Sequence, residues 1–202
     1  MIELKESDLD PSPFVQFERW FEEAKRQQPI LPEAMTVATA ALDGYVTTRV
    51  CLLKSFDRYG FVFFTNYLSR KSIHISENPR ISLSFFWGGL ERQVRIDGVA
   101  VKVSEEESDD YFATRPRGSQ IGAWASTQSA VLVGGRGDLD ARAAQLEATY
   151  RNQPVPRPPH WGGYRVIPTL IEFWQGREDR LHDRLVYRLR QPKDWTIERL
   201  SP

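Results

Sequence analysis

The sequence predicts a mainly β (α+β) protein, an antiparallel barrel with peripheral helices. About eight or nine short segments have strand-like composition, and most of them are joined by turns. The β-α-β alternation of a doubly wound sheet is absent. Prolines cluster at 154–159, but the part that follows is too short to hold a core of its own. We therefore expect residues 1–9 to be a flexible segment and residues 10–202 to form one domain.

In the first half of the chain, a helix precedes a series of strands. Asp10-Pro11-Ser12-Pro13 offers capping chemistry, and apolar residues then recur at helical spacing from Phe14 to about Gln28. A second helix is expected from Ser69 to Asn78, closed by a proline. The expected strands, which are rich in apolar, β-branched and aromatic residues, are 35–41, 45–54, 61–65, 81–86 and 91–103, the last interrupted by Gly98.

The second half begins with helices and ends with strands. A polar and aromatic helix is expected at 104–114, a short helix at 116–124, and a third helix at 139–151. The prolines at 154–159 form a stiff connector. The last expected strands are 164–167, 170–174, 184–189 and 195–200.

The composition excludes several classes of function. The chain of 202 residues has 27 basic and 27 acidic residues, which disfavours general electrostatic binding of nucleic acid. Its single cysteine, Cys51, lies in an apolar run typical of a small buried residue, and its three histidines are scattered, so we expect no metal site. No apolar stretch approaches the roughly 20 residues of a membrane helix, and the acidic N-terminus is no secretory signal. We expect a cytoplasmic protein that binds no membrane.

Two pairs of basic residues are candidate anion-binding groups. Arg70 and Lys71 open an expected helix, where cations oppose the helix dipole unless an anion binds there; a solvated basic turn is the alternative. Arg49 and Lys54 lie on opposite faces of an expected strand. They either reach two different anions or mark strand ends that reach solvent.

Two further groups strengthen the case for a bound anion. Tyr111 and Arg115 share a helix face, and Ser119 follows; all three can donate hydrogen bonds to a phosphate. If the chain is extended from residue 180, Arg180, His182 and Arg184 share one face near Trp174. Three such groups repel one another unless a ligand lies opposite, although Glu178 and Asp183 could be their partners on a surface strand.

These motifs, taken in order, resemble the pyridoxamine 5'-phosphate oxidase family over nearly the whole chain from about Asp10. The resemblance rests most on Ile171-Glu172-Phe173-Trp174-Gln175-Gly176 and Arg180-Leu181-His182-Asp183-Arg184. The other matching segments are Arg49 to Lys54, Phe63-Phe64-Thr65-Asn66, Ser69-Arg70-Lys71, Leu90-Glu91-Arg92-Gln93-Val94, Arg115-Pro116-Arg117, Ser119-Gln120-Ile121-Gly122-Ala123-Trp124, Gln128-Ser129 and Trp161-Gly162-Gly163.

The resemblance implies an FMN-binding split β-barrel that works as a homodimer, with FMN at the subunit interface. Such enzymes oxidise pyridoxamine 5'-phosphate and pyridoxine 5'-phosphate to pyridoxal 5'-phosphate, with O₂ as acceptor and H₂O₂ as by-product. The family usually has a longer N-terminal segment that covers the substrate. Here only about nine mostly polar residues precede Asp10, which leaves open whether that cover forms.

The resemblance also implies roles for individual residues. Arg180 and His182 would be catalytic: Arg180 would position the substrate ring and stabilise developing charge, and His182 would orient the substrate and assist proton movement. The substrate would contact Lys54, Tyr111, Arg115, Ser119, Arg180, Leu181 and His182. FMN would contact Arg49, Val50, Cys51, Leu52, Leu53, Lys54, Phe64, Thr65, Arg70, Lys71, Gln93, Gln128 and Ser129, with Trp174 and Arg184 contributed by the second subunit.

Three other functions fit parts of the pattern. A flavin oxidase of the phenazine pathway would share the FMN residues but not the substrate phosphate residues. A carrier or sensor barrel that binds flavin or haem would not need Arg180 and His182 beside a second phosphate site. A nucleic-acid-binding barrel would need a stripe of basic and aromatic residues, which the sequence lacks.

Overall fold

The computed structural model describes residues 3–27, 30–191 and 194–202. Its strands are β1 (Ala34–Ala40), β2 (Val46–Leu52), β3 (Ser55–Asp57), β4 (Gly60–Asn66), β5 (Arg80–Trp87), β6 (Arg92–Lys102), β7 (Trp161–Gln175), β8 (Asp183–Gln191) and β9 (Asp194–Arg199). Its helices are α1 (Pro13–Gln27), α2 (Arg70–Glu77), α3 (Glu105–Thr114), α4 (Arg117–Ala125) and α5 (Gly135–Thr149), with 3-10 turns η1 (Glu6–Asp8), η2 (Gly88–Leu90) and η3 (Glu178–Arg180).

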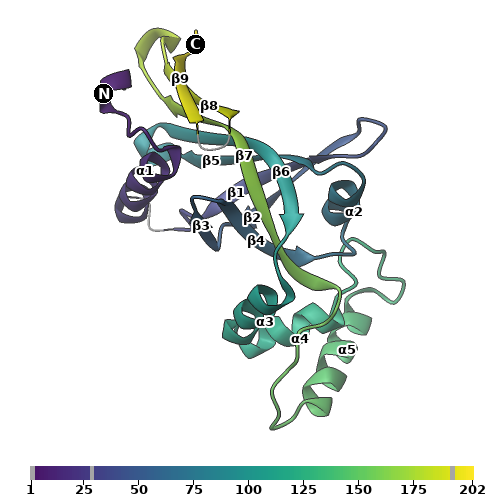
Figure 1. Cartoon of the computed structure of the whole chain (residues 1–202). Coiled ribbons are helices and arrows are strands. Elements are labelled where there is room, and N and C mark those ends of the chain that lie inside the picture. Colours follow the sequence, from purple (N-terminus) through teal and green to yellow (C-terminus); the bar gives the residue numbers. More distant parts are fainter. Residues whose placement is uncertain (1–2, 28–29, 192–193) are drawn as a thin grey trace.

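The described strands form one nine-stranded sheet in which every pairing is antiparallel. The order is β2-β1-β5-β6-β7-β4-β3, with β8 on β7 and β9 on β8. The sheet curls, so that β2 approaches β4 although the two strands form no ladder (Figure 1). This arrangement confirms the predicted mainly β split barrel with peripheral helices.

The hydrophobic core lies on the inner face of the curled sheet, beneath α1. Phe17 of α1 is fully buried, and its ring contacts Phe56, Phe61 and Phe85 at centroid distances of 4.9, 4.9 and 5.2 Å. Burying one such side chain contributes about 1.5–3 kcal/mol. The helical spacing of apolar residues therefore predicted α1 correctly, although its expected end at Gln28 lies outside the described residues.

β7 is a single strand where the sequence predicted two, at 164–167 and 170–174. Pro168 lies inside β7 opposite Gly98, where the register between β6 and β7 shifts. A proline fits at such a bulge because no ladder hydrogen bond requires its missing N–H. Strand β6 continues through Gly98, so the predicted interruption there is only this shift of register. A Cβ at Gly98 would lie 2.2 Å from the carbonyl oxygen of Ile167, which explains the glycine.

Two other elements differ from expectation. The three-residue strand β3, which pairs with β4, has too short a pattern to be recognised in the sequence. Helix α5 begins at Gly135 rather than at Leu139. The sequence does not reveal this earlier start, because the glycines of the first turn have low helix propensity. The negative charge of Asp138 stabilises that turn through the helix dipole.

Residues 3–9 contact the last strand of the sheet, although a flexible segment was expected for residues 1–9. Within the described residues 3–9, Leu4 and Leu9 are each 8% exposed and join the core. The Arg199 guanidinium donates to the Leu4 carbonyl at 2.8 Å. This contact joins residues 195 positions apart, which local sequence patterns do not reveal.

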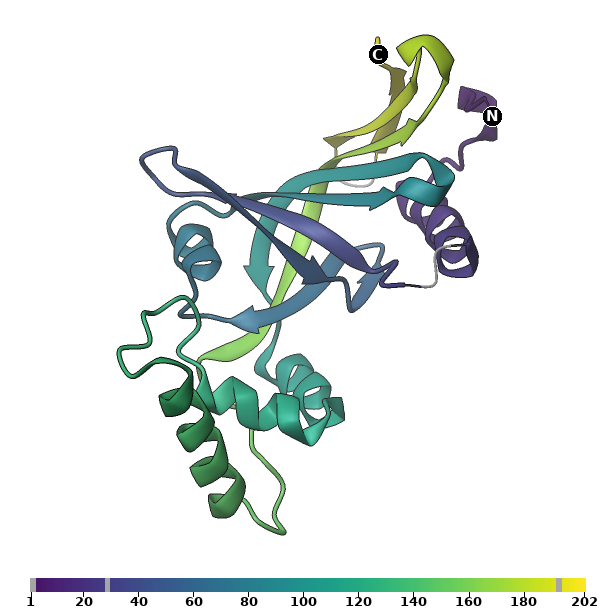
Figure 2. The same ribbon diagram turned by 180° about the vertical axis from the view of Figure 1, so that it is seen from behind.

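Helices α3, α4 and α5 gather at the opposite end of the sheet from β8 and β9 (Figures 1 and 2). A second apolar cluster of Phe112, Ile121, Val155 and Trp161 fixes them there. Among the helices of the described ranges, none has the length and apolarity needed to cross a membrane.

Candidate functional site

A cavity of about 1370 Å³ opens between β2, the end of β4, the start of α2, and α3 and α4. It brings together most of the site residues that the sequence predicted: Arg49, Val50, Cys51, Leu52, Lys54, Phe64, Thr65, Arg70, Lys71, Tyr111, Arg115, Ser119, Gln128 and Ser129. The described residues that line this cavity include no Asp or Glu. The cavity is therefore a concentration of positive charge without counter-charge on its walls.

Lys71, in the first turn of α2, is the most deeply buried of these cations at 6% exposure. Its Nζ donates to Thr65 Oγ1 and Ser69 Oγ at 2.9 Å each and to Gln128 Oε1 at 3.2 Å. These neutral acceptors hold the ammonium in place but leave its charge uncompensated. Burial lowers the pKa of Lys71 from its usual value.

Arg49 lies beside Lys71 and is also held by neutral groups. Its Nη1 donates to the Val37 carbonyl at 3.1 Å and to Thr39 Oγ1 at 2.9 Å, and its Nη2 donates to the Thr47 hydroxyl. Burial lowers the pKa of the Arg49 guanidinium. An anion bound among these groups would compensate the positive charge of both side chains.

The start of α2 completes this corner of the cavity. Its N-cap Ser69 makes no side-chain capping bond, and the backbone N–H of Arg70 donates to Ser129 Oγ at 3.3 Å. Arg70 and Lys71 lie in this first turn, where their positive charges are unfavourable because the N-terminus is the positive end of the helix dipole. An anion there would meet the positive end of the dipole together with both cations.

Arg115 forms a second cationic point across the cavity. Its guanidinium lies 4.6 Å from the ring centroid of Trp161 and 5.6 Å from that of Phe112. Arg115 Nη1 is buried, and no group of the described residues accepts a hydrogen bond from it. Burial lowers the pKa of this guanidinium. A buried, unpaired N–H donor on a positively charged guanidinium is suited to an oxyanion ligand.

Aromatic rings support Arg115. Phe64 stacks on Tyr111 at a centroid distance of 4.0 Å and on Trp161 at 5.4 Å. A Cβ at Gly163 would lie 2.8 Å from the Phe64 ring, so only glycine permits this approach. Tyr111, Arg115 and Ser119 line the same cavity, as predicted, although α3 ends at Thr114 and Arg115 is its C-cap.

One prediction about β2 is corrected by the structure. The strand ends at Leu52, so the alternation of faces does not reach Lys54, and both Arg49 and Lys54 line the same cavity. The Leu53 side chain is buried in the core, and the FMN contact expected of this residue stays a prediction. Cys51 is only partly buried and lines the cavity, where burial raises the pKa of its thiol.

The remaining predicted residues lie outside this cavity. Gln93, Trp174 and Arg184 form one cross-strand row over β6, β7 and β8. Arg184 Nε donates to Glu172 Oε1 at 2.9 Å, so its charge is compensated within the chain. Its partner is Glu172 on the neighbouring strand, and not Glu178 or Asp183, the alternative partners that the sequence offers.

The predicted catalytic residues lie in the loop that precedes β8. The loop is not extended from residue 180, because η3 spans Glu178–Arg180 and β8 begins at Asp183. The extended conformation on which the expected common face depended is therefore absent at Arg180, whereas His182 and Arg184 both lie next to Trp174. The His182 ring lies 4.7 Å from the Trp174 ring, and Leu181 is 69% exposed.

The cavity also contains residues that sequence reasoning missed. They share polar or aromatic side chains and are Tyr45, Thr47, Thr48, Asn66, Thr114, Ser126 and Trp161. Thr47 and Thr48 could have been predicted as cavity residues only weakly, because their sole indication is that they precede Arg49 in the same strand. Trp161 was part of a matching motif, but its contact with Arg115 depends on the fold.

The donors in the cavity fit a phosphorylated flavin. Arg49, Lys71 and the first turn of α2 offer one anion site, and the unpaired Arg115 Nη1 offers another. Between these two points the volume of about 1370 Å³ exceeds that of an ordinary small-ligand pocket. The cavity therefore suits a large ligand with one phosphate, or two phosphorylated ligands together.

Comparison with known proteins places this cavity in context. Residues 21–153 match a family model described as pyridoxamine 5'-phosphate oxidase, and residues 161–202 match one described as the pyridoxine 5'-phosphate oxidase C-terminal dimerisation region. A pyridoxine/pyridoxamine 5'-phosphate oxidase of Rubrobacter xylanophilus is 58% identical over 98% of this chain and 91% of that protein. Another of that name, from Acaryochloris marina, is 55% identical over 98% of this chain and 90% of its own length.

Solved structures agree with the fold. PhzG of Burkholderia lata, determined with tetrahydrophenazine-1-carboxylic acid, has a TM-score of 0.92 and 36% identity over 100% of this chain and 98% of its own. A related FMN-binding protein of Nostoc punctiforme has a TM-score of 0.77 at 13% identity, over 96% of this chain and 100% of its own. The second likeness shows the shared fold alone.

Proposed function

The chain belongs to the pyridoxamine 5'-phosphate oxidase family, and on that premise we propose that it oxidises pyridoxine 5'-phosphate and pyridoxamine 5'-phosphate to pyridoxal 5'-phosphate. It is an oxidoreductase of vitamin B6 metabolism with a flavin cofactor, O₂ as acceptor and H₂O₂ as by-product. The observation that best supports this function is the cavity lined by separate groups of uncompensated cations. FMN and a phosphorylated substrate together would supply two phosphates.

We assign the FMN phosphate to the corner formed by Arg49, Arg70, Lys71 and Ser129. Lys71 and Arg49 are already held there by neutral acceptors, so little side-chain ordering is left for the binding step. The remaining FMN contacts are proposed for residues 50–52 and 54, Phe64, Thr65 and Gln128. FMN held by these residues would supply the redox chemistry, the transfer of electrons from the C4' carbon of the substrate to O₂.

We assign the substrate phosphate to Lys54, Tyr111, Arg115 and Ser119. Arg115 can donate through its free Nη1, and the Tyr111 and Ser119 hydroxyls can donate to the other oxygens. Binding of the phosphate, which takes no part in the reaction, would orient the pyridine ring. A phenazine-type substrate would not need these donors, and the relatives at 55–58% identity favour the phosphorylated substrate over the 36% identical PhzG.

We further propose that a second copy of the chain completes the site. Arg180, Leu181 and His182, with the row Gln93, Trp174 and Arg184, do not line the cavity of their own chain. The match of residues 161–202 to a dimerisation region supports a contribution of Trp174, the 180–182 loop and Arg184 across a homodimer interface. There Arg180 would position the substrate ring and His182 would assist proton movement. Sedimentation tests this arrangement, since a strictly monomeric, active, flavin-loaded protein would contradict it.

The decisive experiment is the visible spectrum of the FMN-loaded protein under anaerobic conditions, before and after pyridoxine 5'-phosphate is added. We expect the flavin absorbance to bleach and to return when air is admitted. Unphosphorylated pyridoxine serves as the matched substrate control and should bleach the flavin much more slowly. A flavin spectrum that persists with the phosphorylated substrate would refute the proposed activity. The expected cytoplasmic location stays a prediction.

A further inference from the structure

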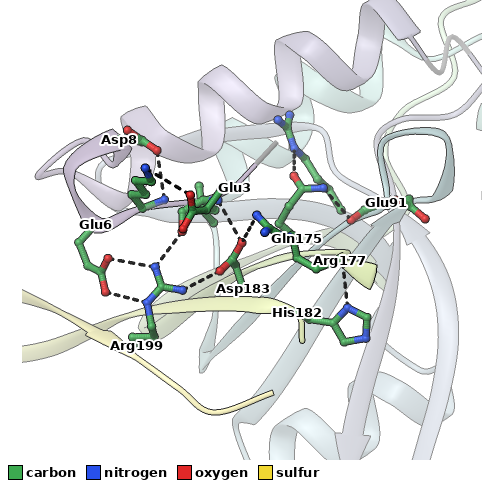
Figure 3. A network of polar contacts seen from close by, with 12 residues as sticks. Glu3, Glu6, Asp8, Glu91, Gln175, Arg177, His182, Asp183 and Arg199 are labelled. Carbon is green, nitrogen blue, oxygen red and sulfur yellow. Dashed lines mark hydrogen bonds and ion pairs between the residues drawn. The ribbon is translucent and has the colours of Figure 1, made fainter. Parts of the chain in front are cut away.

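Asp183 has no role in the site described so far, although it lies between His182 and Arg184 in the motif of residues 180–184. It is a buried carboxylate, 9% exposed, at the first position of β8. Its Oδ2 accepts from the backbone N–H of Leu4 at 3.1 Å, and its Oδ1 accepts from Arg199 Nη1 at 2.7 Å (Figure 3). Both carboxylate oxygens of Asp183 are therefore held by hydrogen bonds.

Arg199 extends this network to the N-terminal segment. Its Nε and Nη2 donate to the two carboxylate oxygens of Glu6 at 2.8 and 3.0 Å, and Nη2 also donates to the Leu4 carbonyl at 2.8 Å. Residues 4–6 and the last residue of β9 are thereby joined to Asp183. We call this set of Leu4, Glu6, Asp183 and Arg199 the terminal clasp.

On its other side, Asp183 lies next to the loop that carries Arg180 and His182. Arg177 Nη1 is 3.6 Å from Asp183 Oδ2, and the backbone N–H of Arg177 donates to His182 Nδ1 at 3.1 Å. Since Nδ1 accepts this bond, the proton of the neutral imidazole lies on Nε2, which can then donate to a ligand. Arg177 thus connects the clasp to the orientation and tautomer of His182.

The loop needs such an anchor because its backbone is strained. Asp179 and Arg180 have φ angles of 56° and 60°, a left-handed conformation that residues other than glycine rarely adopt. Two such residues in succession persist only when the surrounding structure holds them. Leu181 is exposed, so the burial of its own side chain does not hold the loop in this conformation.

We propose that Asp183 is a positioning residue: through Arg177 it holds the 177–182 loop so that Arg180 and His182 face the substrate. This inference rests on the proposed function of that loop. Replacing Asp183 with Asn keeps the shape of the side chain but removes its negative charge. The NH₂ group of the asparagine then faces another donor, either the Leu4 N–H or the Arg199 guanidinium, so one of the two hydrogen bonds is lost. The loop can then relax away from its strained conformation while the cavity, formed by other elements, keeps its flavin.

The test compares the full-length, FMN-loaded wild type with Asp183→Asn. We expect kcat with pyridoxine 5'-phosphate to fall between about 10- and 100-fold, since displacement by about 1 Å costs that much. KM and FMN content should stay within about twofold, because neither phosphate site includes Asp183. The matched control is Glu198→Gln, which removes the Arg188 and Arg190 ion pairs from the same β8–β9 hairpin and should leave kcat unchanged.

A second readout separates positioning from general destabilisation. The chain has three histidines, so ¹H–¹⁵N spectra of the imidazoles are simple, and loss of a signal in His182→Gln assigns it. We expect His182 to show the Nε2–H tautomer in the wild type and an average of both tautomers in Asp183→Asn. If Asp183→Asn does not fold, Glu6→Gln, at the exposed end of the clasp, should shift the His182 signals in the same direction by a smaller amount.

Two outcomes would overturn the proposal. One is an Asp183→Asn enzyme with the kcat and His182 signals of the wild type. The other is an equal fall of kcat in Glu198→Gln, which would indicate a general effect of the hairpin. A wild type that does not oxidise pyridoxine 5'-phosphate would refute the proposed function instead, and the His182 tautomer would still decide whether Asp183 orients the loop.

Discussion

Replacing Arg115 with Lys should weaken the use of the phosphorylated substrate without affecting the flavin. Lys keeps the positive charge but lacks the planar guanidinium that lies 4.6 Å from the centroid of the Trp161 ring. It also loses one of the two parallel N–H donors that a guanidinium offers to a phosphate. A desolvated cation–π contact contributes about 2 kcal/mol, part of which a lysine retains, and a hydrogen bond to a charged group contributes about 1.5–3 kcal/mol. The combined loss of about 2–3 kcal/mol corresponds to a fall in kcat/KM of about 30- to 150-fold.

Steady-state oxidation of pyridoxine 5'-phosphate, measured by H₂O₂ release, checks this magnitude. Arg117→Lys is the matched control, because Arg117 donates to Glu147 and to the Tyr150 and Gln153 carbonyls outside the cavity. Unphosphorylated pyridoxine gives the second comparison, since without a phosphate the two enzymes should differ by less than about threefold. An equal loss for both substrates would refute the assignment of Arg115 to the substrate phosphate.

Three further outcomes follow from the site and the fold. Lys71→Ala should lower FMN content more than the turnover of the flavin-loaded fraction, and Arg180→Ala should do the reverse; equal flavin loss in both variants would contradict this division. Because burial lowers the pKa of Lys71 and phosphate binds its charged form, FMN affinity measured by flavin fluorescence should fall as pH rises toward 10.5, and Lys71→Arg should abolish the fall. Gly98→Ala should lower the free energy of unfolding in urea by more than about 2 kcal/mol, since its Cβ would lie 2.2 Å from the Ile167 carbonyl oxygen; an unchanged midpoint would count against the bulge geometry.

Local patterns predicted most of the elements and the polar groups that bear on an anion, whereas the resemblance to a known family supplied the other cavity residues. Helix α1 follows from the spacing of its apolar residues, and the irregularity of β6 follows from Gly98. Arg70 and Lys71 were recognised as candidate anion-binding residues because their positive charges oppose the dipole of α2. These signals are local, so a single sequence contains them.

The missed features depend on contacts between distant residues. The bonds from Arg184 to Glu172 and from Arg199 to Leu4 join strands or segments whose proximity no periodicity reveals. The Pro168 in β7 suggested a break in the strand, because only the bulge opposite Gly98 makes a proline acceptable there. The alternation that placed Arg180, His182 and Arg184 on one face assumed an extended chain, whereas η3 bends it.

The terminal clasp separates two parts of the molecule that contribute to one site. The residues that line the cavity lie between Tyr45 and Trp161, so none of them belongs to the clasp. Leu4 and Glu6 reach Arg199 across 195 and 193 positions of the chain. A change that displaces either of these distant segments would therefore disturb the loop of Arg180 and His182 while the walls of the cavity stay in place.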